Sequence, residues 1–66
     1  MIIVMKQNAP LTEIERLEDE LREKGFQVDR SRGSSKVVLG LVGDTTSLDE
    51  RDFLSKEWVA KVEREQ

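Results

Sequence analysis

Apolar and polar residues follow a strand-like pattern in four parts of this chain, three of which lie within residues 1–42. The chain opens with five consecutive apolar residues, Met1–Met5, followed by turn formers at 7–10. A short apolar run that ends in turn formers predicts a buried strand. Apolar and polar residues alternate over 26–32, which predicts a half-buried strand. The short turn at 33–35 joins it to an apolar strand at 37–42, so these two strands form a hairpin.

The segment 13–24 has the helical period instead. Its apolar residues recur every three or four positions, which predicts an amphipathic helix. Thr12 followed by Glu15 is a capping-box pattern and marks the start of this helix, and Gly25 marks its end. The apolar stripe consists of Ile14, Leu17 and Leu21.

A shorter helix is predicted near 48–56, where Ser47 and Glu50 repeat the capping-box pattern. A last strand follows at 58–63. The charged faces of both helices are typical of solvated surfaces, which on the first helix predicts i,i+4 pairs such as Glu20 with Lys24.

The resulting order β-α-β-β-α-β predicts an α+β fold of the ferredoxin-like class. In this arrangement a four-stranded antiparallel sheet carries both helices on one face. Two right-handed crossovers place the first and third strands in the centre and the second and fourth at the edges. We expect residues 1–66 to form one such domain.

Apolar residues face both sides of the two central strands. This pattern is typical of strands that are buried on both faces. The edge strand at 26–32 differs, because its Gln27, Asp29 and Ser31 place polar groups on one side. Since an exposed apolar patch usually marks an interface, we expect a second copy of the domain or another domain to cover the open face. The alternative is a small sheet that tolerates some exposed Val and Ile.

Composition limits the chemistry of the chain. It has 66 residues, no Cys and no His, and a net charge of −3. The usual groups for proton transfer, nucleophilic attack and zinc binding are therefore missing, and we expect no enzymatic activity, metal or cofactor. The acidic balance argues against nucleic-acid binding. The apolar start is too short for a signal peptide or membrane span, so we expect a cytoplasmic protein without membrane contact.

Three segments together resemble one known family along the whole chain. They are the opening MIIVMK, the segment Asp29–Gly33, and the run VVLGLVGD at 37–44. They resemble the N-terminal ferredoxin-like regulatory domain of 3-deoxy-D-arabino-heptulosonate 7-phosphate (DAHP) synthases, which perform the first committed step of aromatic amino-acid biosynthesis. In that family the domain precedes a metal-dependent TIM barrel, which condenses phosphoenolpyruvate with erythrose 4-phosphate. The 66 residues include none of this barrel, so the resemblance implies a regulatory domain that does not catalyse by itself.

The resemblance also implies a binding site and partners. Regulatory domains of two subunits would pair through the sheet face or the hairpin, hold tyrosine or phenylalanine between them, and block the barrel's active site. The implied ligand-binding residues are Asp29, Ser31, Arg32 and Gly33. The family often has His at the position of Asp29, and Asp there favours the ammonium of an amino acid over its carboxylate. The alternative is a small protein–protein interaction or dimerisation module without a small-molecule ligand, in which these residues serve ordinary edge-strand and hairpin roles.

Overall fold

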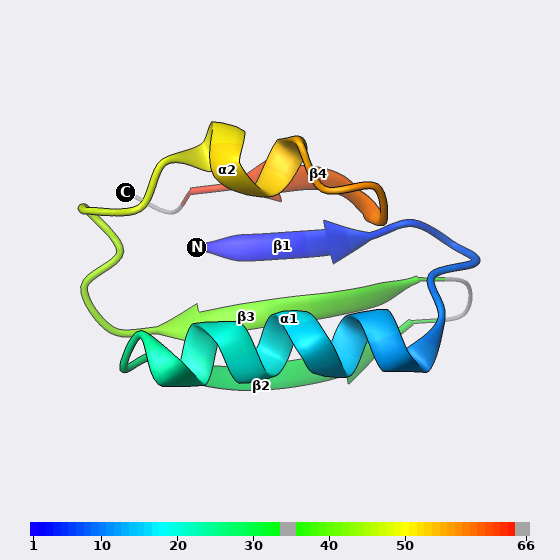
Figure 1. Ribbon diagram of the computed structural model, residues 1–66, viewed down its shortest axis with the longest axis horizontal. Helices are drawn as coiled ribbons and strands as arrows, with labels where there is room; N and C mark the ends of the chain where they lie inside the picture. Colours follow the sequence, from blue (N-terminus) through cyan, green and yellow to red (C-terminus); the bar gives the residue numbers. More distant parts are fainter. Residues whose placement is uncertain (34–35, 65–66) are drawn as a thin grey trace.

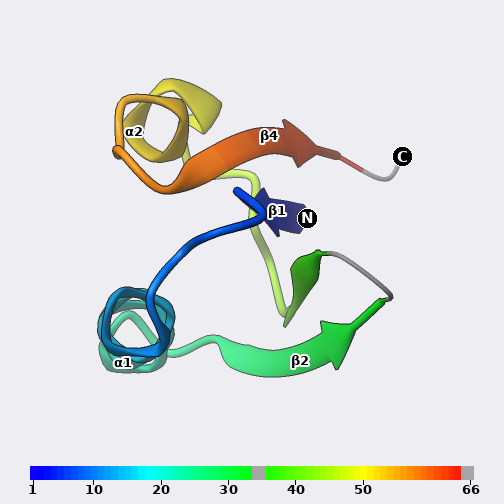
Figure 2. The ribbon, with the colours of Figure 1, turned by 90° about the vertical axis from the view of Figure 1, so that its right-hand side faces the viewer.

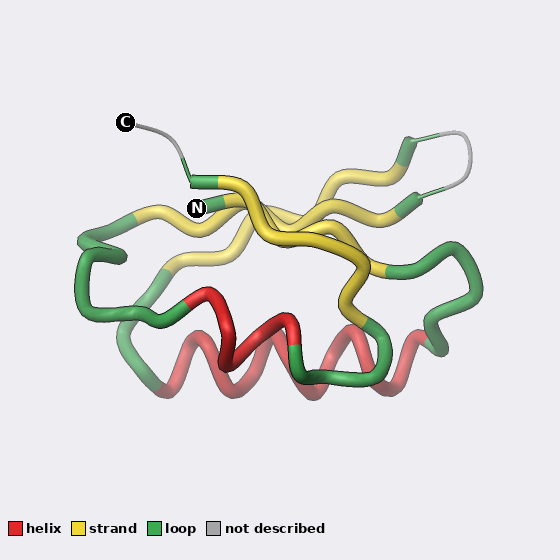
Figure 3. Tube along the Cα trace, turned by 90° about the horizontal axis from the view of Figure 1, so that it is seen from above, coloured by secondary structure: helices red, strands yellow, loops and turns green. Residues whose placement is uncertain are grey.

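Strands and helices follow one another in the predicted order. The structure is a computed structural model that describes residues 1–33 and 36–64. Its elements are β1 (Ile2–Met5), α1 (Leu11–Glu23), β2 (Gln27–Arg32), β3 (Val37–Val42), α2 (Glu50–Leu54) and β4 (Val59–Glu63). The strands form one antiparallel sheet in the order β2-β3-β1-β4 (Figure 1). Both helices cover the same face of this sheet (Figure 3). The predicted ferredoxin-like class, with β1 and β3 in the centre, is therefore confirmed.

The start of α1 differs from the prediction. The helix begins at Leu11, and its N-cap is Pro10, which forms no side-chain cap hydrogen bond. The carbonyl of Pro10 accepts hydrogen bonds from the backbone N–H groups of Glu13 and Ile14 at 3.0 and 3.1 Å. Thr12 thus lies inside the first helical turn, one residue after the helix begins, and is not at the N-cap position. The predicted capping role of Thr12 is wrong.

The end of α1 follows the prediction. Gly25 has a φ of 95°, a conformation that glycine adopts without steric cost. Its N–H donates to the carbonyl of Arg22 at 2.9 Å, and the N–H of Phe26 donates to the carbonyl of Leu21 at 3.1 Å. This pair of hydrogen bonds is the Schellman motif, which satisfies the last carbonyls of a helix.

Helix α2 is shorter than predicted and has a different cap. A separate turn precedes it, in which the N–H of Leu48 donates to the carbonyl of Thr45 at 3.0 Å. The N-cap is Asp49, whose carboxylate accepts from the N–H of Arg51 at 2.9 Å. The capping box predicted from Ser47 is therefore wrong, because the chain turns once more before the helix begins. Strands β2 and β4 each begin one residue later than predicted.

The core lies between the sheet and the two helices (Figure 2). The predicted stripe of α1 is buried there against the inward-facing side chains of the strands. Ile3, Leu21 and Leu39 are fully buried. The whole buried cluster comprises Met1, Ile3, Met5, Ile14, Leu17, Leu21, Leu39, Leu41, Phe53 and Val59.

The opposite face of the sheet is also apolar along its centre. The strand registers place Val4 beside Val38, and Ile2 beside Gly40, on this open face. Val42 follows on the same side of β3 and has an exposed fraction of 53%. The prediction of apolar residues on both faces of the central strands is thus confirmed. The expectation that a second copy or another domain covers them stays a prediction.

Candidate functional site

The implied ligand-binding residues lie at the edge of the sheet, on β2 and the turn after it. Asp29 pairs with Gly40, and Ser31 pairs with Val38, so both of their side chains belong to the open face. Side chains alternate along a strand, and the side chain of Arg32 therefore lies on the opposite, helix-covered side. The structure brings Asp29 and Ser31 together on one face and separates Arg32 from them.

The turn of the β2–β3 hairpin is closed by Gly33. Its N–H donates to the carbonyl of Lys36 at 2.8 Å. The N–H group of Gly33, which we expected to be available to a ligand carboxylate, is thus already hydrogen-bonded within the hairpin. The two serines at 34–35, which complete the predicted turn, lie outside the described residues.

The side chains of Asp29, Ser31 and Arg32 are exposed. None of them forms a hydrogen bond or ion pair with another side chain in the described parts of the chain. The carboxylate and hydroxyl on the open face are therefore solvated and available to a partner. They resemble the polar rim of an interface more than a fixed structural network.

Cross-strand rows connect this polar edge to the apolar centre of the open face. One row runs from Asp29 through Gly40 to Ile2. Gly40 has no side chain, so it leaves the surface between Asp29 and Ile2 low. On the far edge, Lys61 and Glu63 form an ion pair at 2.9 Å. The open face therefore presents an apolar strip between two polar edges, which can contact an apolar group and an ammonium together.

Comparison with known proteins shows which family this chain belongs to. The family of DAHP synthase ferredoxin-like domains matches residues 1–64. The chain belongs to this family. Among solved structures, the crystal structure of phospho-2-dehydro-3-deoxyheptonate aldolase (DAHP synthase) from Thermotoga maritima is similar in fold, with a TM-score of 0.77 and 22% sequence identity. The match covers 88% of this chain and 17% of that enzyme. No curated protein matches significantly.

This ferredoxin-like domain contains a buried ion pair that the sequence analysis missed. Glu18 on α1 is only 2% exposed, and both of its carboxylate oxygens accept hydrogen bonds from Arg30 on β2. The Nε–Oε2 distance is 2.8 Å, and Nη2 donates to Oε1. Hydrogen bonding from Arg30, more than its charge or that of Arg22, lowers the pKa of the Glu18 carboxyl. The pair joins the first helix to the edge strand.

A signal for this pair exists in the sequence. Glu18 directly follows Leu17 and precedes Leu21 by three positions, so it lies at the border of the apolar stripe. Arg30 has the inward parity of Val28 on a strand whose other face is polar. A charged side chain that faces inward is rare unless it is paired. Glu18 and Arg30 are therefore expected to form an ion pair when α1 packs against β2.

The described residues offer no metal centre. Among residues 1–33 and 36–64, no three Asp, Glu, His or Cys side chains are grouped so that they would hold a metal ion. Over the same ranges, none of the helices has the length and apolar character needed to cross a membrane.

Proposed function

We propose that this chain is the regulatory domain of a DAHP synthase and that it acts together with the catalytic barrel of that enzyme. The match to the family over residues 1–64 supports this assignment. The chain has no Cys and no His for the chemistry of the enzyme. The domain itself would therefore bind and regulate, and the barrel would catalyse the reaction.

The open sheet face supports a specific mode of regulation. Two copies would pair so that the apolar strips of their open faces, which include Ile2, Val38 and Val42, are covered. An exposed apolar patch of this kind is a typical interface. Such pairing would bury the side chain of Val42, which is 53% exposed in the single domain.

The effector would be tyrosine or phenylalanine, held at the edge of this interface. Asp29 would accept a hydrogen bond from the ammonium group, and Ser31 would offer its hydroxyl. The aromatic ring would lie on the low surface at Gly40, against the apolar strip. The observation that carries this proposal is the adjacency of an exposed carboxylate and an uncovered apolar surface on one face. The carboxylate of the effector would be held by a cation of the other copy, because Arg32 lies on the opposite side of β2.

One observation favours a second candidate, an interaction module without a small ligand. Arg32 lies on the opposite side of β2 from Asp29, and Gly33 already donates its N–H within the hairpin. A single domain thus lacks a cation beside Asp29 on the open face of β2. In this case the open face would still pair with another copy, but no amino acid would be needed.

Titration of phenylalanine or tyrosine into isotope-labelled protein tests the first proposal. We expect saturable amide shifts around residues 29–33 and 38–42 at millimolar ligand. Asp29→Asn should weaken binding by up to about fivefold, because an exposed charge pair contributes up to about 1 kcal/mol. Asp52→Asn, an exposed change of the same kind on α2 at the helix-covered side of the sheet, is the matched control. Absence of shifts both in this domain and in the barrel-containing enzyme would contradict effector binding.

Sedimentation tests the pairing of copies. Val38→Glu places a charge in the apolar strip, and we expect it to abolish self-association while leaving the fold intact. Ile3 is unsuitable for this purpose, because it is fully buried under the helices and a charge there would unfold the domain. A protein that is monomeric at high concentration, with Val38→Glu without effect, would contradict the shared interface.

A further inference from the structure

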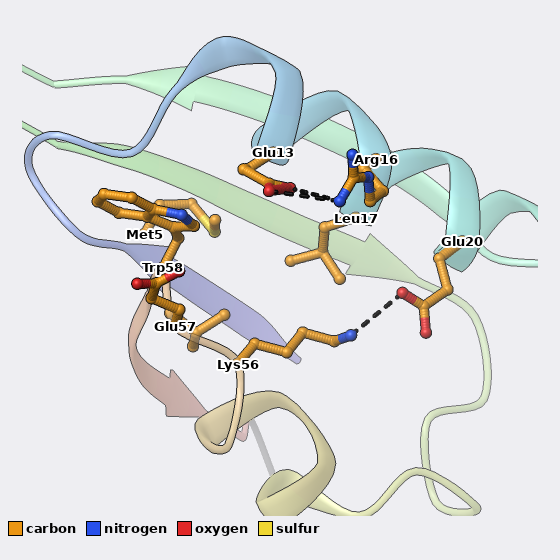
Figure 4. A pocket seen from close by; sticks show the side chains of 9 residues that line it. Met5, Glu13, Arg16, Leu17, Glu20, Lys56, Glu57 and Trp58 are labelled. Atoms are coloured by element: carbon orange, nitrogen blue, oxygen red, sulfur yellow. Dashed lines mark hydrogen bonds and ion pairs between the residues drawn. The ribbon is translucent and has the colours of Figure 1, made fainter.

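A cleft lies on the helix side of the sheet, away from the open face. It has a volume of about 210 Å³ and is bounded by α1, the end of β1 and the connection from α2 to β4 (Figure 4). Its floor is apolar, because Met5, Leu17 and Val59 line it and are nearly fully buried. The half-exposed indole of Trp58 forms one wall. The volume lies below the roughly 300 Å³ at which pockets for drug-sized ligands begin, so the cleft accommodates a ligand with about one ring.

The charges at the rim are unbalanced. Arg16 pairs with Glu13 at 3.2 Å, and Lys56 reaches across the cleft to Glu20 at 3.2 Å (Figure 4). The expected pair of Glu20 with Lys24 is thus replaced by a pair that links α1 to the segment after α2. Glu57 also lines the cleft, and in the described parts of the chain it has neither a hydrogen bond nor an ion pair through its side chain. Both cations at the rim are thus already paired with a carboxylate, and the carboxylate of Glu57 is left without a cation among the residues that line the cleft.

We propose that this cleft binds a small organic cation, in which a primary ammonium is attached to an aromatic or other apolar body. The apolar body would lie on the floor formed by Met5, Leu17 and Val59. The ammonium would meet the carboxylate of Glu57 and the π-face of Trp58, because an indole ring is the best aromatic partner for a cation. The net charge of −3 on the chain adds to the attraction.

An anionic ligand fits this cleft poorly. A carboxylate would face three glutamates at the rim, and it would have to replace Glu13 or Glu20 as the partner of a cation. The sign of the ligand's charge is therefore the feature by which the cleft discriminates. Because the cleft and the open face lie on opposite sides of the sheet, this site is independent of the effector site proposed above.

The fluorescence of Trp58 reports on this cleft directly, because the chain contains one Trp and no Tyr. Phenethylammonium is the probe, and hydrocinnamate is the matched anion with the same ring and a similar chain. We expect phenethylammonium to change the Trp58 emission saturably with a Kd on the order of millimolar, as a small ligand in a shallow site allows. We expect no saturable change with hydrocinnamate.

Two variants locate the contact. Glu57→Gln should weaken phenethylammonium binding about fivefold, the upper range for an exposed charge pair. Glu23→Gln, an exposed change on α1 outside the cleft, should leave the binding unchanged. Amide shifts should fall on residues 13–20 and 56–59. Lack of saturable binding, equal binding of hydrocinnamate, or equal affinity of the Glu57→Gln variant would each overturn the proposal. Trp58 emission and the amide shifts at 13–20 and 56–59 report on the cleft, whereas binding of the proposed effector shifts the amides at 29–33. A negative result at one site can therefore be distinguished from a negative result at the other.

Discussion

Replacing Glu18 with glutamine tests whether the buried ion pair holds α1 on the edge strand. The glutamine keeps the shape of the side chain and one carbonyl that can accept from the guanidinium of Arg30. It removes the negative charge and turns the second oxygen into an NH₂ group, which faces an N–H donor. The variant therefore leaves a buried side chain with an unsatisfied donor and a guanidinium without its counter-charge, and neither change creates a cavity.

The expected cost follows from the burial of Glu18. A hydrogen bond to a charged group contributes about 1.5–3 kcal/mol, and removal of one partner from a fully buried pair costs about 3–5 kcal/mol. The Arg30 side chain is 30% exposed, so water replaces part of the lost interaction. We therefore expect Glu18→Gln to lower the free energy of unfolding by about 2 kcal/mol, which in a domain of this size lowers the Tm by roughly 10 °C.

The pH dependence has a definite sign. Arg30 holds the pKa of the Glu18 carboxyl below its ordinary value of 4.5 in the folded domain, whereas the unfolded chain titrates near that value. The stabilisation by the carboxylate is thus fully present above pH 4.5 and is lost as the pH falls through the lower folded pKa. Glutamine does not titrate. The difference in stability between the wild type and the variant should therefore be largest near neutral pH and shrink in acid.

Urea unfolding followed by circular dichroism measures this difference at several pH values. Glu23→Gln, an exposed change on the same helix, is the matched control and should alter the free energy of unfolding by no more than about 0.5 kcal/mol. The reasoning fails if Glu18→Gln costs no more than this control. It also fails if the cost is the same in acid as at neutral pH, because the loss would then reflect packing and not charge.

Three further substitutions, two of them with a control variant, test local features of the fold through the midpoint of urea unfolding. Gly43→Ala should lower the free energy of unfolding by about 1–2 kcal/mol, because φ at Gly43 is 133° and the ring of Phe26 would lie 3.2 Å from the new methyl group. Gly40→Ala is the control: the atom nearest to its new methyl group would be 3.8 Å away, so this variant should be neutral or slightly stabilising. Asp49→Ala should lower the midpoint and Ser47→Ala should not, because Asp49 is the residue that caps α2. If Ser47→Ala were the more damaging of the two, the cap predicted from Ser47 would be correct after all. Phe53→Ala should cost about 3–5 kcal/mol, since Phe53 is 2% exposed, and a smaller loss would mean that α2 packs loosely.

The fold was predictable because its main signals are local. Ile14, Leu17 and Leu21 define the inward side of α1 by spacing alone, and Gly25 ends the helix through a backbone conformation that other residues rarely adopt. The helix starts were not predictable in the same way. Both capping boxes are valid local patterns, but Pro10 and Asp49 close the first turns in their place. The path of the preceding loop decides at which residue the helix begins, and the cap position moves with it: α1 starts one residue before Thr12, and α2 starts after an additional turn.

The candidate site was predictable only in part, because it depends on which side chains share a face. Alternation along β2 places Asp29 and Ser31 on the open face. The sequence alone treated Arg32 as their neighbour, although a strand separates residues of unlike parity. The burial of Glu18 was not predictable from the helix alone, because it depends on Arg30, which is twelve positions away. The cleft beside Trp58 likewise requires three segments that meet only in the folded chain.

The division of charges between the two faces of β2 has a consequence for the proposed effector site. Arg30 is engaged by Glu18 under the helices, and Arg32 belongs to the same side, so the open face of β2 carries a carboxylate without a neighbouring cation. An amino acid that binds there can place its ammonium at Asp29, but β2 itself offers no cation to its carboxylate. We expect a second copy or the barrel to supply that cation. We therefore expect phenylalanine or tyrosine to bind more tightly to paired domains than to a monomer. Val38→Glu, which we expect to prevent the pairing of copies, should then weaken effector binding although Val38 offers the ligand no polar contact. Unchanged affinity in this variant would show that one domain holds the whole amino acid.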